Sequence, residues 1–368
     1  MSEMVGVPRI LKLLNKDIIE KVIQENGPIT KPEIARQTNL SLVTVNKIVE
    51  TLLLENKIRM SGVNESTGGR RAQSYIINKE LNYNIVLLYH RDQLLGIVTN
   101  SIGDEIYEKE FPLRTDTYEN TMIDIYAAID GLLEQCGSHE VTAIGIGVPG
   151  VVSGGFVTNI PNIPGWEGMN VAEVIEEKYQ IRVFLENDIN LATMGIYSNE
   201  YKDDVDNLLV IYMEKGIGSG IILNKELFKG SSNFAGELSY MPVAMRSTRK
   251  GEKRKYKGHL ENEIAVISEE MRRCGDKERM EWKELLLKTM RDSLLSIICI
   301  LNPEIVVIQY EMLEETDMKI LEEMLGELID GENIPKLVKA DNLKKHSIRG
   351  LIDLCMNNTM SMYSLSKK

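Results

Sequence analysis

The chain has 368 residues and a formal net charge of −12, with 43% hydrophobic and 27% charged residues. Because a single compact domain seldom reaches this length, the sequence predicts two or three globular units, each with its own core. No run of about 18 apolar residues is present, which argues against a helical membrane span, and the N-terminus shows no secretory cleavage pattern. We therefore expect a cytoplasmic protein without a membrane partner.

The charge is unevenly distributed along the chain. Residues 1–80 hold 7 Lys and 5 Arg against 8 Glu and 1 Asp, a net charge of +3, so the remaining residues carry −15. Attraction to nucleic acid is local. A basic head on an acidic body is therefore typical of a protein whose head alone approaches phosphate groups.

Three helices are predicted near the N-terminus. An apolar stripe marks Asp17–Gln24 as the first, and a capping-box pattern of Thr30 and Glu33 opens a second helix that ends near Asn39. Ser41 is a suitable N-cap for the third helix. The apolar positions of this third helix recur at helical spacing and are Val45, Ile48, Val49 and Leu52.

The third helix is predicted to be a recognition helix. Two short helices joined by a tight turn, the second with small polar residues near its start, match the helix-turn-helix geometry that enters the major groove of DNA. The residues expected to contact DNA from this helix and its cap are Ser41, Val43, Thr44, Asn46 and Lys47.

Two short strands, Lys57–Met60 and Ser74–Ile77, flank a Gly-Gly-Arg-Arg tip at residues 68–71. This pattern is typical of a wing, in which the guanidinium groups of Arg70 and Arg71 contact phosphate or a narrow minor groove. The alternative is a three-helix interaction domain with a solvated basic hairpin. The wing favours a winged helix-turn-helix DNA-binding domain at residues 1–80.

Beyond residue 80, short apolar strands alternate with amphipathic helices, which predicts an α/β fold. We expect strands at Ile85–Leu88, Leu94–Val98 and Val141–Val148, and a helix near Met122–Gln135. Short motifs rich in Gly, Pro and Asn punctuate this pattern. They lie at residues 145–150, 159–166, 186–188, 216–220 and 236–237.

The order of these motifs resembles the ROK family of repressors and sugar kinases over nearly the whole chain, and in particular its xylose- and N-acetylglucosamine-type repressors. The Gly-Gly-Arg-Arg tip resembles that of ROK repressors, and Leu301–Ile308 resembles the family's late strand after a long helix. The resemblance implies that residues 81–368 form a two-lobed, actin-like sugar-kinase fold of ribonuclease-H-like halves. It also implies that a sugar binds between the lobes.

Carried over by position, the resemblance implies sugar contacts from Asn162, Asn187, Asp188, Glu237 and Tyr240. Amides and carboxylates suit this role because each can pair with two hydroxyls of a sugar ring. Tyr240 stands where relatives carry a histidine. Other interpretations stay open for three of these residues: Asn162 could fill a turn, Asp188 could cap the following helix, and Glu237 could be a surface carboxylate.

The sequence departs from the kinase members of the family at both phosphate loops. Leu88 stands at the aspartate of the first loop and His90 at its glycine, while Glu214 brings a carboxylate to the second loop. Without these loops, Asp188, the counterpart of the kinase general base, has no phosphate cradle beside it. Because phosphoryl transfer depends on positioning and charge neutralisation, Asp188 alone is not expected to support it. We predict that the protein is not an enzyme and has no cofactor.

A metal site is not expected either, because Tyr240 replaces the family's zinc-binding histidine and the basic stretch at residues 246–257 contains no cysteine. The sequence thus predicts a repressor that binds double-stranded operator DNA and a sugar or sugar-phosphate effector, as a homodimer or homotetramer. Two other classes stay open. These are an active sugar kinase with a regulatory head, and a DNA-bound scaffold without a sugar effector.

Overall fold

The computed structural model describes residues 7–63, 73–90, 93–158, 169–214, 216–246 and 258–365. The chain divides into two compact units. The first contains the residues up to Tyr83 together with two short segments, Asn100–Asp104 and Cys136–Glu140, and the second contains the rest. The domain boundary at residue 80 stays a prediction, because the first unit also includes these two segments.

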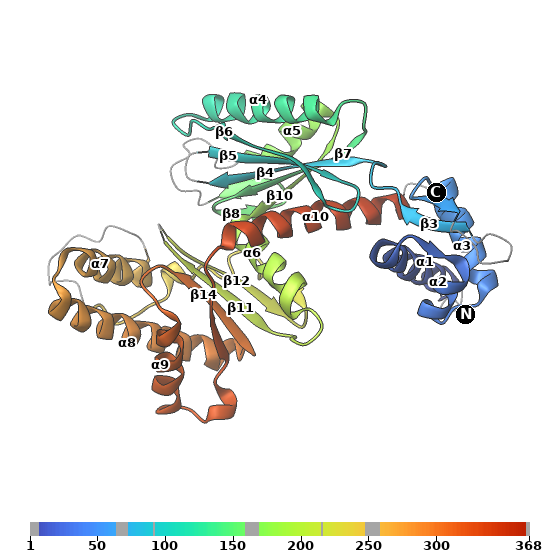
Figure 1. The fold of residues 1–368 in the computed structure, drawn as a ribbon. Helices are drawn as coiled ribbons and strands as arrows, with labels where there is room; N and C mark the ends of the chain where they lie inside the picture. The colour runs from blue at the N-terminus through green and yellow to red at the C-terminus, as the bar shows by residue number, and fades with distance from the viewer. Residues whose placement is uncertain are drawn as a thin grey trace. The chain divides into compact units, whose positions relative to one another are not determined.

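The first unit begins with α1 (Val7–Asn26), α2 (Lys31–Thr38) and α3 (Leu42–Leu54), drawn in blue in Figure 1. The backbone N–H and the hydroxyl of Thr30 both donate to Glu33 Oε2, at 2.9 and 2.6 Å, which confirms the predicted capping box. The predicted start of α1 is wrong. The helix already begins at Val7, because strong helix formers such as Leu and Lys extend it before the buried apolar stripe.

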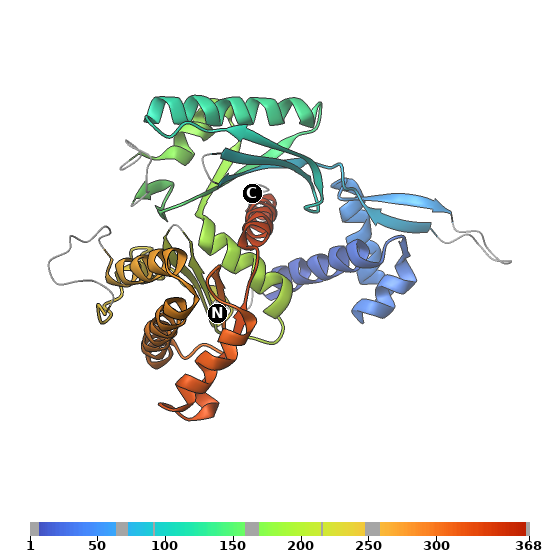
Figure 2. The ribbon, with the colours of Figure 1, turned by 60° about the vertical axis from the view of Figure 1, so that its left-hand side comes forward.

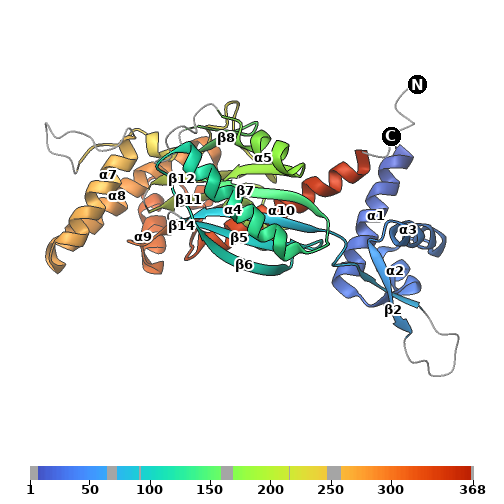
Figure 3. The same ribbon diagram turned by 90° about the horizontal axis from the view of Figure 1, so that it is seen from above.

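A three-stranded sheet in the order β1-β3-β2 completes the first unit. Its strands are β1 (Ile29–Thr30), β2 (Ile58–Val63) and β3 (Gln73–Ile77), and the antiparallel pairing of β2 with β3 confirms the two predicted wing strands. Figure 3 shows the three helices gathered together, with this hairpin extending from them. The core contains large apolar side chains from every helix and from β3, among them Ile19, Ile34, Val49, Leu52 and Tyr75.

Two five-stranded sheets with the same strand arrangement dominate the second unit, which also contains a two-stranded sheet of β8 (Val151–Ser153) and β9 (Phe156–Thr158). The strands of the first sheet, which runs β10-β7-β4-β5-β6, are β4 (Tyr83–His90), β5 (Gln93–Asn100), β6 (Glu105–Pro112), β7 (Val141–Val148) and β10 (Arg182–Asn187). Those of the second sheet, which runs β13-β12-β11-β14-β15, are β11 (Leu208–Met213), β12 (Ile217–Leu223), β13 (Glu226–Leu227), β14 (Ile305–Tyr310) and β15 (Lys336–Lys339). In each sheet three consecutive strands lie side by side and two later strands are added beside the first of them. This repeated order confirms the two-lobed expectation.

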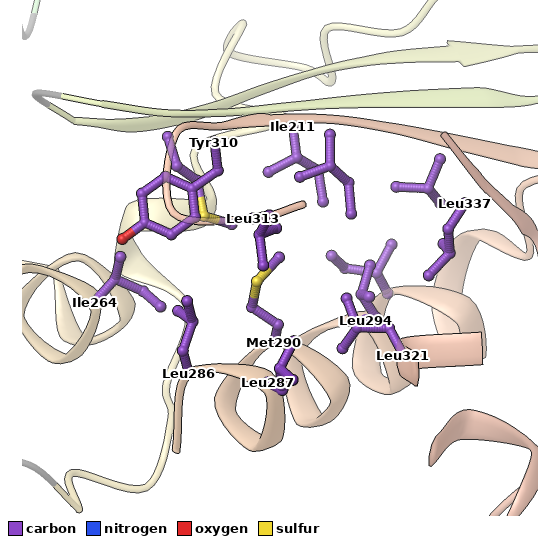
Figure 4. Packing of buried hydrophobic residues seen from close by; sticks show 14 of the residues in the cluster. Ile211, Ile264, Leu286, Leu287, Met290, Leu294, Tyr310, Leu313, Leu321 and Leu337 are labelled. Atoms are coloured by element: carbon purple, nitrogen blue, oxygen red, sulfur yellow. The ribbon is translucent and has the colours of Figure 1, made fainter. Parts of the chain in front are cut away.

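Helices cover both faces of these sheets. In chain order they are α4 (Tyr118–Cys136), α5 (Val171–Tyr179), α6 (Asp188–Ile196), α7 (His259–Arg273), α8 (Asp276–Leu301), α9 (Glu315–Gly326) and α10 (Leu343–Leu365). In Figure 4, Leu286, Met290 and Leu294 of α8 pack toward Ile211 and Tyr310 of the second sheet. Among the helices in the described ranges, none combines the length and apolar character needed to cross a membrane.

The helices α6 and α10 lie between the two sheets and cross closely (Figure 2). A side-chain carbon at Gly195 would lie 2.1 Å from the His346 carbonyl oxygen, and one at Gly350 would lie 2.0 Å from that of Leu191. Only glycine permits backbones to approach so closely. The start of α6 is therefore held at a defined place between the sheets.

Candidate functional site

The start of α3 is arranged as the sequence predicts. Ser41 Oγ accepts a hydrogen bond from the Thr44 backbone N–H at 3.1 Å and lies 2.8 Å from Thr44 Oγ1. Val45 and Val49 are fully buried in the core of the first unit. The N-cap and the buried stripe of this helix are confirmed.

The outward side of α3 presents Val43, Asn46 and Lys47. Val43 is 65% exposed, Lys47 is exposed and Asn46 is partly exposed, whereas the hydroxyl of Thr44 engages the cap. These three side chains are therefore the ones that this part of the helix can offer to a partner surface. Their contacts with DNA stay predictions.

A second candidate site lies where β10 ends and α6 begins. Asn187 Oδ1 accepts hydrogen bonds from the backbone N–H groups of Ile189 and Asn190, at 2.9 and 3.0 Å, and Asn187 Nδ2 donates to the Gly150 carbonyl oxygen at 2.8 Å. Asn187 is thus the N-cap of α6, and the alternative that Asp188 caps this helix is wrong. Because both polar atoms of its amide bind the chain's own backbone, Asn187 holds the turn that carries Asp188.

Asp188 is the first residue of α6, and its side chain is partly buried. Burial raises the pKa of its carboxyl to about 7, against the opposing effect of the N–H groups at the start of the helix, and the charge of Glu237 adds to the increase. A carboxyl with this pKa exchanges its proton near neutral pH. It can therefore either donate or accept a hydrogen bond under ordinary conditions.

The loop that carries Glu237 is fixed to β12. The backbone N–H and the hydroxyl of Ser219 both donate to the Gly236 carbonyl oxygen, at 3.0 and 2.8 Å. Gly236 has a φ of 95°, and a side-chain carbon there would lie 2.2 Å from the Ser219 carbonyl oxygen, so this position requires glycine. Glu237 is partly buried, which contradicts the alternative of a freely exposed carboxylate, and burial together with the charge of Glu261 raises its pKa.

Glu261 is a third carboxylate of this site, and the sequence motifs do not mark it. It lies in the first turn of α7, and burial raises its pKa. The Leu260 backbone N–H donates to the Met241 carbonyl oxygen at 3.2 Å, and a side-chain carbon at Gly258 would lie 2.1 Å from the Ser239 carbonyl oxygen. These contacts bring α7 to the loop of the Gly-Glu motif. The glycine at 258 is the one sequence signal of that approach.

An aromatic pair stands on the same loop. Phe234 is 47% exposed and Tyr240 is 37% exposed. The centroids of their rings lie 5.5 Å apart. Such rings offer apolar faces on the loop that carries Glu237. Three other predicted site residues, Asn162, Arg70 and Arg71, lie outside the described residues, so their contacts stay predictions.

Apolar packing occupies the position that the resemblance assigns to the kinase aspartate. Leu88 is 4% exposed and belongs to a buried cluster with Leu191 and Leu351. Glu214 follows β11, is exposed, and accepts a hydrogen bond from Gln309 Nε2 at 3.4 Å. Neither Leu88 nor Glu214 offers a side-chain donor to a phosphate group. In the part of the chain that the structure describes, no three His, Cys, Asp or Glu side chains are grouped to hold a metal ion.

These features define a winged helix-turn-helix unit and a body of the sugar-kinase type. The sequence matches a winged helix-turn-helix DNA-binding domain over residues 11–59 and the ROK family over residues 91–358. The chain belongs to the ROK family.

Similar curated proteins include two kinds of repressor. The xylose repressor of Bacillus subtilis is 29% identical over 236 residues, which cover 63% of this chain and 61% of that protein. The N-acetylglucosamine repressor of Escherichia coli O157:H7 is 27% identical over 245 residues, which cover 65% of this chain and 60% of that protein. The chain thus aligns with about three fifths of the length of these relatives.

Solved structures share the fold. A ROK family transcriptional regulator, described as a homolog of the Escherichia coli MLC protein, has a TM-score of 0.75 and 18% identity and is matched over 97% of this chain and 100% of that one. The ROK hexokinase from Thermus thermophilus has a TM-score of 0.59 and 20% identity, over 76% of this chain and 99% of that one. At these identities the likeness is one of fold.

The raised pKa of Asp188 makes the stability of the protein depend on pH. The folded-state pKa of about 7 lies above the unfolded value of about 3.9. Folding therefore takes up a proton between these values, and the free energy of unfolding falls as the pH rises from about 4 to about 7. Urea unfolding measures this free energy. Between about pH 5 and 7.5 we expect it to fall less steeply with pH for Asp188→Asn than for the unmodified protein. Asp203→Asn, which changes an exposed carboxylate, is the control and should keep the original slope; equal slopes in all three proteins would contradict the assignment.

Proposed function

We propose that this protein is a transcriptional repressor of carbohydrate genes, which binds double-stranded operator DNA through its winged helix and a sugar through its ROK body without phosphorylating it. The observation that carries the proposal is the presence, in one chain, of a helix-turn-helix unit and a kinase-type body that keeps its carboxylates but has Leu88 buried in an apolar cluster. The names of the two related repressors support the carbohydrate role. The paired half-sites that such DNA-binding units favour support a homodimer or homotetramer.

The carboxylate cluster favours a neutral sugar over a sugar phosphate. Asp188, Glu237 and Glu261 offer acceptors for sugar hydroxyls, and the charges of the two glutamates act on their neighbours' pKa values. A phosphate dianion next to these groups would be repelled. The rings of Phe234 and Tyr240 offer apolar surface to the C–H groups of a sugar ring. A ligand held between segments from both sheets would favour one arrangement of the lobes and so couple sugar binding to DNA binding.

The DNA-binding proposal separates phosphate contacts from base contacts. Replacing Arg70 and Arg71 together by alanine is expected to weaken binding to all duplexes and to lower the salt slope by about one to two units, because fewer counterions are released. Asn46→Ala and Lys47→Ala are expected to change the preference among DNA sequences instead, because these side chains lie on the outward side of α3. Fluorescence anisotropy on duplexes selected from a randomised pool measures both effects. Lys79→Ala, an exposed lysine beyond the end of β3, serves as the control. Absence of duplex binding by the full chain at low salt would contradict the proposal.

The sugar proposal rests on Asp188. Its replacement by alanine is expected to reduce sugar affinity by about 1.5–3 kcal/mol, or roughly ten- to a hundredfold, the range of a hydrogen bond that involves a charged group. Calorimetric titration with D-xylose and N-acetyl-D-glucosamine checks this, and their phosphate esters should bind at least about tenfold more weakly. DNA affinity without sugar should stay unchanged, as should the sugar affinity of Asp203→Ala. If no neutral sugar or sugar phosphate binds at millimolar concentration, the DNA-bound scaffold without effector replaces this proposal.

The proposal also predicts that the body does not transfer phosphoryl groups. With ATP, magnesium and the same sugars, we expect sugar-phosphate formation at the background rate, because Leu88 and Glu214 supply no phosphate donors. Chromatographic detection of the sugar phosphate measures this. Stoichiometric turnover that disappears in Asp188→Asn would instead establish the active kinase.

A further inference from the structure

A buried carboxylate precedes the cap of α6. Glu186 lies in β10 of the first sheet and is 4% exposed. Its Oε1 accepts hydrogen bonds from the Asn187 backbone N–H at 2.9 Å and from Asn190 Nδ2 at 3.0 Å. Its Oε2 accepts a hydrogen bond from Lys229 Nζ. The Glu186 carboxylate thus binds both the start of α6 and a lysine in the loop after β13 of the second sheet.

Lys229 belongs to the loop that carries Glu237. It comes two residues after the end of β13, an edge strand of the second sheet. Its carbonyl oxygen accepts a hydrogen bond from the Ala235 backbone N–H at 3.1 Å, which closes a loop that leads directly into Gly236 and Glu237. The Lys229 side chain therefore connects the loop that carries Glu237 to Glu186, which lies just before Asp188 and the start of α6.

We propose that Glu186 and Lys229 form a positioning pair, which holds the Asp188 and Glu237 segments at the separation that a sugar bridges. This inference rests on the proposed sugar site, and it assigns the pair no contact with the ligand: both oxygens of Glu186 accept hydrogen bonds from the chain, one of them from Lys229 Nζ. The attraction between the two residues and the bridging by a ligand favour the same arrangement of the two sheets. The two effects therefore reinforce each other.

Lys229 is the partner to replace. Its side chain is 33% exposed and borders a cavity of about 580 Å³, so its substitution neither opens a void in the core nor introduces a clash. Glu186, in contrast, is buried and holds α6 directly. Removing the lysine tests the bridge and leaves the contacts of Glu186 with Asn187 and Asn190 available.

Calorimetric titration of D-xylose and N-acetyl-D-glucosamine compares three variants of the full chain. We expect Lys229→Met to bind roughly tenfold more weakly, in line with the loss of a charge-paired contact, and Lys229→Arg to stay within about threefold of the unmodified protein. Lys225→Met is the matched control, because Lys225 lies on the adjacent turn and pairs with Asp206 at 3.2 Å on the surface. It should leave sugar affinity unchanged. Equal affinity of Lys229→Met and Lys225→Met would overturn the proposal.

A double variant separates positioning from a purely structural role. Glu186→Gln with Lys229→Met removes both charges and leaves no unpaired buried carboxylate. A purely structural pair predicts that melting temperature and sugar affinity both return to the original values. A positioning pair predicts that the melting temperature recovers while the affinity stays roughly tenfold low. Full recovery of affinity would therefore refute the positioning role.

Amide hydrogen exchange without sugar provides a readout that does not depend on ligand binding. In Lys229→Met we expect faster exchange at the start of α6 and in residues 229–237, but not in Lys225→Met. If the unmodified protein binds none of the sugars, the proposed sugar site is wrong. Hydrogen exchange then tests by itself whether Glu186 and Lys229 hold the two segments in place. Unchanged exchange in both segments would overturn it.

Discussion

The candidate sugar site depends on the close packing of α6 against the elements around it. A side-chain carbon at Gly220 of β12 would lie 2.0 Å from Thr193 Oγ1, and one at Gly350 of α10 would lie 2.0 Å from the Leu191 carbonyl oxygen. A helix enclosed in this way has no space to shift, so a change in the arrangement of the sheets must move it against a neighbour. The same packing gives Asp188, at the first position of α6, a reproducible place.

The carboxylate cluster is unfavourable for the protein without ligand. Asp188, Glu237 and Glu261 all have raised pKa values, with burial as the first cause in each case, which means that the charged forms are disfavoured where they stand. The helix N–H groups near Asp188 offset only part of this effect. Donors from a polyhydroxylated ligand would stabilise all three groups at once. The arrangement is typical of a site whose local instability serves binding.

Features set by neighbouring residues could be predicted from the sequence, and features set by distant contacts could not. The capping box at Thr30 and the cap at Ser41 follow from local patterns, and the two-lobed body follows from the family resemblance. The cap of α6 shows the limit of local reasoning, because Asn187 and Asp188 are both good caps and the extended backbone at Asn187 decides between them. Glu261 joins the site through a backbone contact of α7 with the Gly-Glu loop, and Lys229 reaches it through the ion pair with Glu186, and no sequence spacing links these segments.

Leu88 also bears on how this body can change over evolutionary time. Its Cδ1 would lie 2.6 Å from a side-chain carbon at Gly147, and it shares an apolar cluster with Leu191 and Leu351. An aspartate at this position would bury a carboxylate among these side chains without a partner, at a penalty of several kcal/mol. Introducing an acidic residue at this position would therefore require repacking between the sheet and α6 before the new carboxylate brought any advantage. Intermediates on that route would be less stable than either end, so the packing at Leu88 resists the replacement of this leucine by an acidic residue.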